Sequence, residues 1–212
     1  MEITTLMMIA AGLATSYWIA HCYRRPSLKK SVIKTLSVVL LLAAAALGHG
    51  PVLLIVALAL CALGDYLLSR AGDGAFMAGV GAFAAGHLAY IALFLTTPGA
   101  DLGRIPAAWP ILAGLAVLGI VMAVLLWPRT GALRGPVMAY IPIILGMGVS
   151  AQALPLAVQD ARLAAFLFIA SDLILALEMF VLREGPAKRL APFAIWPLYW
   201  LAQALFTLAF IG

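Results

Sequence analysis

The chain has 212 residues, of which 66% are hydrophobic and only 10% are charged. This composition excludes an ordinary soluble globular domain and is typical of an integral membrane protein. The net charge of +5 does not indicate a nucleic-acid partner, because the few cations lie between apolar runs instead of forming one basic face. The two cysteines, Cys22 and Cys61, have neither the number nor the spacing of a disulfide framework or a zinc site.

Apolar runs of about 20 residues fill the chain, and each is long enough to cross a hydrocarbon core. We predict an all-α integral membrane protein, a bundle of about eight transmembrane helices that forms a single domain over residues 1–212. The first run is predicted to be a span and not a signal peptide, because it lacks a preceding basic region and a cleavage site. The predicted spans are 3–20, 32–48, 52–70, 75–95, 107–127, 136–154, 161–182 and 191–211.

The cations predict how the bundle is oriented in the membrane. The loops after the odd-numbered spans, together with the start of the second span, hold eleven of the thirteen Lys and Arg residues, and the other side holds two. Cytoplasmic loops carry an excess of Lys and Arg, so we expect these loops to be cytoplasmic and both termini to lie outside. The eleven are Arg24, Arg25, Lys29, Lys30, Lys34, Arg70, Arg129, Arg134, Arg183, Lys188 and Arg189, and the two are Arg104 and Arg162.

Two acids lie inside apolar runs. Asp65 follows Gly64, and Asp172 follows Ser171. A charged carboxylate near the bilayer interior costs at least about 2.5 kcal/mol, so each acid must be neutral, partnered or facing water. From a rise of about 1.5 Å per residue, we place Asp65 about 9 Å and Asp172 about 15 Å from the cytoplasmic ends of their spans.

Other polar side chains lie in the cytoplasmic half of their spans. Because polar groups in a membrane line pockets in preference to facing lipid, we expect a polar cavity open to the cytoplasmic leaflet. The fourth predicted span also carries a stripe on one helical face, and its glycines 79, 81 and 86 are expected to allow close helix approach. The polar residues are Lys34, Tyr140, Tyr199 and Gln203, and the stripe is Phe76, Gly79, Phe83, His87 and Tyr90.

Four motifs in this order resemble the YhhN family of bacterial and animal membrane proteins. They are Gly64-Asp65-Tyr-Leu-Leu68, the stripe from Phe76 to Tyr90, Ser171-Asp172, and Tyr199-x-x-x-Gln203. The resemblance covers the second to the eighth predicted span. It departs from the family early in the second span, where Lys34-Thr35 replaces a common Lys-Pro pair.

The resemblance implies a function and a location. Characterised members are lysoplasmalogenases, which hydrolyse the vinyl ether bond of lysoplasmalogens to a fatty aldehyde and a glycerophospho-alcohol. The resemblance maps the family's acids onto Asp65 and Asp172 and its histidine onto His87. It implies a multi-pass protein of the bacterial inner membrane, whose partners are a vinyl ether lysophospholipid and membrane lipid, with no cofactor and no metal.

Vinyl ether cleavage is acid-catalysed: a proton adds to the outer vinyl carbon, water attacks the oxocarbenium ion, and the hemiacetal collapses. Two carboxyl groups supply donor, base and negative charge if one is neutral while the other is ionised. We expect Asp65 and Asp172 to be catalytic, with either as the donor, and His87 and Ser171 to support them. The expected substrate-binding residues are Lys34, Tyr90, Tyr140, Tyr199 and Gln203.

Each of these residues also has a purely structural interpretation. The aspartates, His87, the tyrosines and Gln203 can serve as interhelical hydrogen-bonding groups, and Lys34 can extend its amine to the interface. Ser69 and Ser171 more often bond backbone carbonyls than acids. Glu178 is expected to be peripheral, because it points about 120° away from Asp172 on an ideal helix.

Two other functions place acids inside spans. A proton-coupled lipid or small-molecule transporter uses buried acids between repeated halves, and Asp65 and Asp172 are four predicted spans apart. An intramembrane aspartyl protease also uses two acids, but Ala62 replaces the glycine expected before Gly64-Asp65. A serine hydrolase is disfavoured because Gly148-Val-Ser-Ala-Gln152 lacks the closing glycine of a nucleophile elbow.

Overall fold

The computed structural model describes residues 2–24 and 27–212, and this part of the chain contains helices, turns and no strand. The long helices are α1 (Ile3–Ala20), α2 (Leu28–Leu47), α3 (Val52–Leu68), α4 (Asp73–Thr96), α6 (Trp109–Leu126), α7 (Arg134–Ser150), α8 (Asp160–Phe180) and α9 (Pro186–Ile211). Short helical turns connect them: α5 (Arg104–Ala107), η1 (Gly131–Leu133), η2 (Ala151–Ala153) and η3 (Leu156–Val158). The all-helical prediction is therefore confirmed.

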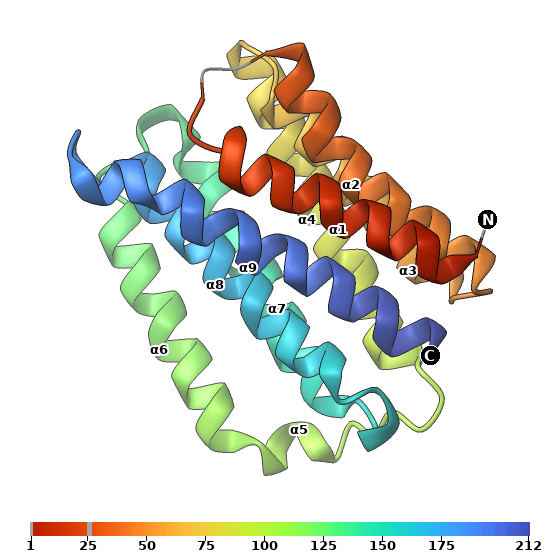
Figure 1. Cartoon of the computed structure of the whole chain (residues 1–212). Coiled ribbons are helices and arrows are strands. Elements are labelled where there is room, and N and C mark those ends of the chain that lie inside the picture. Colours follow the sequence, from red (N-terminus) through yellow and green to blue (C-terminus); the bar gives the residue numbers. More distant parts are fainter. Residues whose placement is uncertain (1, 25–26) are drawn as a thin grey trace.

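Within the described residues, seven segments are long and apolar enough to cross a membrane: α1, α2, α4, α6, the segment Gly131–Ala153 around α7, α8 and α9. Helix α3 is also apolar but is one turn shorter than the average span, at 17 residues. The chain is thus a multi-pass bundle. Both termini lie at the same end of it (Figure 1), and their placement outside the cell stays a prediction.

Two helices begin earlier than predicted. Helix α2 begins at Leu28 because the Ser27 hydroxyl caps it, accepting a hydrogen bond from the Lys30 amide at 3.2 Å. Helix α9 begins at Pro186, since a proline at the first helical position lacks only an N–H that would have no partner. The lysines and arginine predicted in loops therefore lie in first turns: Lys29, Lys30, Lys188 and Arg189. Arg25 lies outside the described residues.

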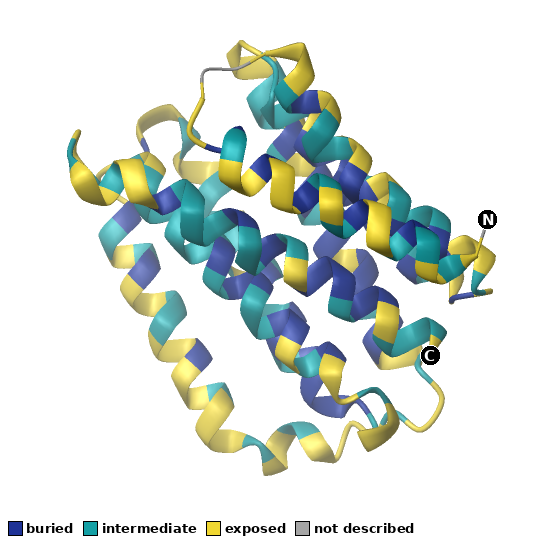
Figure 2. Cartoon of the chain, viewed as in Figure 1, coloured by how far each residue is buried: buried dark blue, intermediate teal, exposed yellow. Residues whose placement is uncertain are grey.

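The helices pack as neighbouring pairs around a shared core. Helix α3 packs along α4, α8 along α9, and α1 along α2, while α2 and α3 also contact α9. Helix α6 is different, because its main neighbour is α7, and it lies at the periphery (Figure 1). Most of its surface is exposed or half-buried (Figure 2). One side of the bundle is therefore closed by a single loosely packed helix.

Close approach of α3 and α4 depends on glycines. A Cβ added at Gly64 would lie 2.6 Å from the ring of Phe83, and one at Gly86 would lie 2.9 Å from Cys61 Sγ. A Cβ at Gly79 would lie 2.8 Å from the Leu68 side chain. The prediction of close approach is thus confirmed for Gly79 and Gly86, but it is wrong for Gly81, which has no neighbour within 4 Å. Gly64 is the residue that lets Asp65 lie beside α4.

Helix α9 is held against α1 by two tryptophans. Pro197 has no N–H, so the carbonyl of Phe193 loses its helical donor, and the Trp18 indole donates to that carbonyl at 2.9 Å. Trp196 donates to the Ala14 carbonyl, also at 2.9 Å. Both bonds lie in the part of α9 that precedes Tyr199.

Candidate active site

A cavity of about 480 Å³ opens near the end of the bundle opposite the termini. Its lining is mainly apolar and comes from α6, α7, α8 and α9, with further residues from α2, α3 and α4. Ligand sites have this character, a large apolar surface with a few polar groups. The charged residues, tyrosines and serine on the wall are Tyr17, Lys30, Lys34, Asp65, Tyr140, Ser171, Asp172, Glu178 and Tyr199.

Asp65 is fixed by neighbours from two other helices. Its Oδ1 lies 2.8 Å from Nζ of Lys34 on α2, and its Oδ2 accepts a hydrogen bond of 2.8 Å from the Tyr199 hydroxyl on α9. The Asp65 side chain is fully buried, whereas that of Lys34 is 21% exposed. An ammonium group in contact favours the ionised carboxylate. Asp65 is therefore held in place by the Lys34 amine on one side and the Tyr199 hydroxyl on the other.

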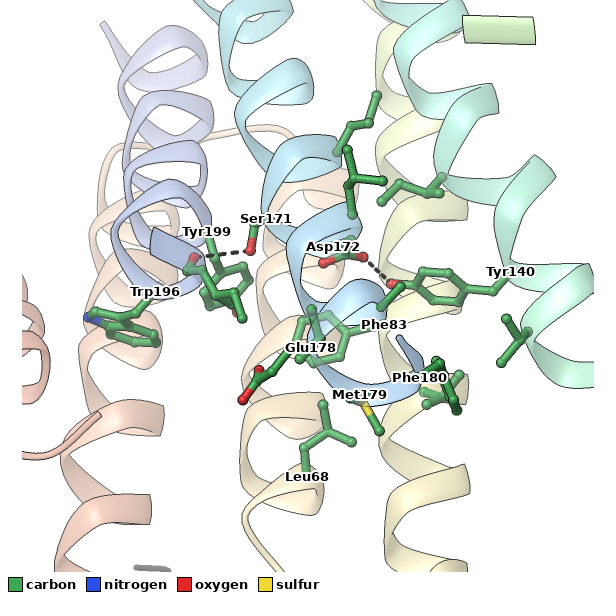
Figure 3. Close-up of a pocket in the computed structure, with 18 of the residues that line it drawn as sticks. Leu68, Phe83, Tyr140, Ser171, Asp172, Glu178, Met179, Phe180, Trp196 and Tyr199 are labelled. Atoms are coloured by element: carbon green, nitrogen blue, oxygen red, sulfur yellow. Dashed lines mark hydrogen bonds between the residues drawn. The ribbon is translucent and has the colours of Figure 1, made fainter. Parts of the chain in front are cut away.

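Asp172 has a different environment. Its Oδ2 accepts a hydrogen bond of 2.5 Å from the Tyr140 hydroxyl on α7 (Figure 3). Its side chain is 13% exposed, and no lysine or arginine of the described chain lies within 4.0 Å of it. Because the exposed part belongs to the wall of the cavity, a bound molecule can meet Asp172 directly.

The two acids line one cavity, but they belong to separate hydrogen-bonded groups. No hydrogen bond joins Asp65 to Asp172 in the described part of the chain. Phe83 lines the same cavity and packs edge-on against Tyr199 and Phe168, with ring centroids 5.7 and 6.3 Å apart. Each acid therefore has its own partner and does not share a proton with the other by direct contact.

His87 lies behind Asp172 and is fully buried. Its Nδ1 donates to the Phe83 carbonyl at 2.7 Å, since a carbonyl oxygen only accepts. Its Nε2 lies 3.9 Å from Oδ2 of Asp172 and has no hydrogen-bond partner among the described residues. The structure thus brings His87 close to Asp172, although His87 is not part of the cavity wall.

Of the remaining predicted residues, Ser171 lines the cavity and Tyr90 and Gln203 do not. Ser171 lines the cavity, but its hydroxyl donates to the Ile195 carbonyl at 3.0 Å. Tyr90 donates to Gln203 Oε1 at 2.5 Å, and neither of these buried residues is among the described residues that line the cavity. Ser69 likewise bonds a backbone carbonyl, that of Tyr66. The serines therefore make backbone bonds, as predicted.

Sequence reasoning missed two features of the site. Glu178 lines the cavity, so its expected peripheral position is wrong, because the cavity extends along more of the α8 circumference than Asp172 alone would cover. The α6 wall, formed by Leu118, Gly119, Met122 and Leu126, was also unforeseen. Nothing in a uniformly apolar helix distinguishes a lipid-facing side from a cavity-facing one.

The described residues include no group of three or more His, Cys, Asp or Glu side chains arranged to hold a metal ion. Cys22 and Cys61 are free and buried.

Comparisons with known proteins match the chain to one family and to named relatives. The model of a family described as the YhhN family matches residues 29–210. A protein named lysoplasmalogenase from Mycobacterium bovis is 31% identical over 201 residues, covering 90% of this chain and 71% of the relative. A Mycobacterium tuberculosis protein of the same name matches with the same identity and coverage. No solved structure matches the chain.

Proposed function

The chain belongs to the YhhN family, and on that basis we propose that it is a lysoplasmalogenase of the bacterial inner membrane, with both termini outside. The reaction is hydrolysis of the vinyl ether bond of a lysophospholipid to a fatty aldehyde and a glycerophospho-alcohol. The observation that carries the proposal is that one largely apolar cavity holds both a lysine-paired carboxyl group and a second carboxyl group without a cation. The two mycobacterial relatives, which are both named lysoplasmalogenase, also support the proposal.

Asp172 is the proton donor in this mechanism. A carboxyl group beside an apolar cavity and without a cationic partner is more cheaply kept neutral than charged. Tyr140 donates to Oδ2, which leaves Oδ1 of Asp172 to carry the proton. Oδ1 delivers the proton to the outer vinyl carbon, the carbon–carbon double bond becomes a single bond, and the positive charge is shared by the inner carbon and the ether oxygen.

Asp65 supplies the negative charge and the base. Lys34 and Tyr199 keep this carboxylate ionised and fixed, so its charge is already in place when the oxocarbenium ion forms. A water molecule then adds to the inner carbon and loses a proton to Asp65. The hemiacetal then collapses to the aldehyde: its carbon–oxygen bond to glycerol breaks, the glycerol oxygen takes the proton held by Asp65, and the hemiacetal hydroxyl gives its proton to the Asp172 carboxylate, which restores both acids. His87, with Nε2 3.9 Å from Oδ2 of Asp172, packs behind that acid and is assigned to positioning it, because the proton on its Nδ1 is donated to a backbone carbonyl.

The apolar wall provides the site for the hydrocarbon chain. Leu118 and Met122 of α6 and Ile141 and Ile144 of α7 line this part of the cavity. An apolar wall of this kind can take up an alkenyl chain from the bilayer without exposing the chain to water. Tyr90 and Gln203, which do not line the cavity, are assigned to packing between α4 and α9 and not to substrate binding.

The test is aldehyde release by the purified protein. Incubated in detergent with a lysoplasmalogen, the wild-type chain is expected to release fatty aldehyde without an ion gradient or ATP. The Asp172→Asn variant keeps an oxygen to accept the Tyr140 bond but has no acidic proton, so turnover should fall by about a hundredfold to ten-thousandfold. Full turnover by this variant would remove Asp172 from the chemistry.

The same assay separates the alternatives. A proton-coupled transporter would release no aldehyde under these conditions. An intramembrane aspartyl protease would leave the lipid intact and cleave a transmembrane peptide. The matched control is Ser171→Ala, because its hydroxyl bonds a backbone carbonyl and not an acid, and it should retain most of the activity.

A further inference from the structure

A second, smaller pocket of about 140 Å³ lies beside the cavity where α1, α2 and α3 meet. Its lining is Tyr17, Lys30, Ser31, Lys34, Leu68 and Ser69, and we call it the side pocket. Tyr17, Lys30, Lys34 and Leu68 also line the main cavity. The side pocket is therefore a branch of the main cavity, and Lys34 lies on the wall that they share.

Lys30 is directed toward the side pocket by the backbone of the preceding loop. Its Nζ donates to the Cys22 carbonyl at 3.0 Å and to the Arg24 carbonyl at 2.7 Å. An ammonium group has three N–H donors, so one donor is left. A lysine that only extends toward the interface would keep its amine in water. Lys30 is instead half-buried, and its Nζ lies 5.9 Å from the centroid of the Tyr17 ring, another residue of the pocket lining.

Arg70 supports the opposite side of the side pocket. Its Nη2 donates to the Ser31 hydroxyl oxygen at 2.6 Å, and the same atom lies 3.4 Å from the Ser69 hydroxyl. The guanidinium group also lies over the Tyr66 ring, 4.8 Å from its centroid. Since both serines line the pocket, Arg70 fixes their side chains and places a further positive charge behind them.

The charges around the side pocket do not balance. Lys30, Lys34 and Arg70 contribute three positive charges, and the nearby carboxylates are Asp65, which pairs with Lys34, and Glu178 on the wall of the main cavity. In the described part of the chain, neither Lys30 nor Arg70 has a carboxylate within 4.0 Å. One positive charge is left over, and one monoanion would neutralise it.

We propose that the side pocket binds the phosphate of the lipid substrate, a phosphodiester monoanion, through Lys30 and Lys34, with Arg70 as a positioning residue. This inference rests on the proposed function for the identity of the lipid. The glycerol backbone is a short spacer between the ether oxygen and the phosphorus. Lys34 contacts Asp65 and also lines the side pocket, so it connects the acid of the reaction site with the proposed phosphate site. Binding the phosphate there directs the vinyl ether toward the acids.

Binding of uncleavable lipids tests the proposal without any turnover. The probes are 1-O-alkyl lysophospholipid, which carries the phosphodiester, and 1-O-alkylglycerol, which lacks it. Lys30→Gln should weaken binding of the phospholipid about tenfold, the value of one charge-assisted hydrogen bond, and leave binding of the alkylglycerol unchanged. Lys30→Arg should restore most of the loss. Binding is measured as ligand-induced stabilisation of the purified protein in detergent.

The matched control is Lys29→Gln, which removes the same charge from an exposed neighbouring residue in the first turn of α2. It should bind both probes as the wild type does. Equal weakening by Lys29→Gln would overturn the proposal in favour of a general surface charge effect. Equal weakening of both probes by Lys30→Gln would also overturn it, by showing that Lys30 supports the fold and not the phosphate.

Inorganic phosphate distinguishes the lipid from a free anion. Stabilisation by millimolar phosphate, lost in Lys30→Gln and as large as that given by the phospholipid, would overturn the lipid assignment. With cleavable lysoplasmalogen, Lys30→Gln should raise KM about tenfold and change kcat little, because the lost contact serves binding. Lipid binding that depends on Lys30 in a protein that releases no aldehyde would refute the proposed hydrolysis and leave the phosphate site standing.

Discussion

The two acids of the cavity differ in both exposure and partners. Asp65 is fully buried between Lys34 and Tyr199, whereas Asp172 is 13% exposed and accepts a bond from Tyr140. A buried charge needs an opposite charge, while a carboxyl group without one is better kept protonated. The comparison teaches that two similar sequence motifs lie in different surroundings, with a lysine partner on α3 and without one on α8, and the proposed mechanism assigns them different roles for that reason.

Breaking the ion pair gives the largest expected effect. Asp65→Asn leaves Lys34 unpaired, and we expect a loss of about 2 kcal/mol of stability, below the range for fully buried pairs because Lys34 is 21% exposed. Turnover should fall at least a hundredfold. The double variant Asp65→Asn with Lys34→Gln should regain the stability but not the turnover, measured by thermal unfolding in detergent and by aldehyde release.

Asp172→Asn is the control for this cycle. It should lose turnover while its unfolding temperature stays close to that of the wild type, because no ion pair is broken. Equal loss of stability in the two Asn variants would mean that the acids do not differ as their surroundings indicate.

Removing the hydroxyl beside each acid sharpens the comparison. Tyr140→Phe takes away the hydrogen bond that orients Asp172, and we expect kcat to fall about tenfold. Tyr199→Phe should lower kcat only about threefold, because Lys34 still holds Asp65. Single-turnover aldehyde release separates these effects from lipid binding. The reverse order would assign the proton donor to Asp65.

The smallest effect is expected away from both acids. Tyr90→Phe leaves Oε1 of Gln203 without its donor, so stability should fall by about 1 kcal/mol while turnover stays within about twofold. Replacing Gln203 with Leu in the same chain removes the orphaned group and should recover part of the loss. If Tyr90→Phe lost turnover at unchanged stability, Tyr90 would belong to the substrate site after all.

The sequence was sufficient for the spans and for the candidate acids. Long apolar runs and the cost of a charge in lipid are local properties, so residues such as Asp65 and Asp172 stand out without coordinates. The first span, 3–20, coincides with α1, whereas the start of α2 was misplaced because the predicted span began at the first apolar run and ignored the Ser27 cap.

The partners of the acids needed the fold. From the sequence, Lys34 can either extend to the interface or pair with an acid. The packing of α2 against α3 shows that it pairs with Asp65. Tyr140 was a candidate for binding substrate, and it bonds Asp172 because α7 lies beside α8. Glu178 was placed away from the site because it points about 120° from Asp172 on an ideal helix. That angle does not reveal how much of the α8 circumference the cavity covers, and the cavity reaches Glu178.

The loosely packed α6 has a consequence for how the reaction ends. The proposed reaction divides an amphiphile into an apolar aldehyde and a water-soluble phospho-alcohol. The cavity has a matching division, with apolar side chains of α6 on one side and the lysines Lys30 and Lys34 on the other. The aldehyde can depart sideways into the bilayer while the phospho-alcohol departs into water. Neither product then blocks the other, and the two cannot easily recombine.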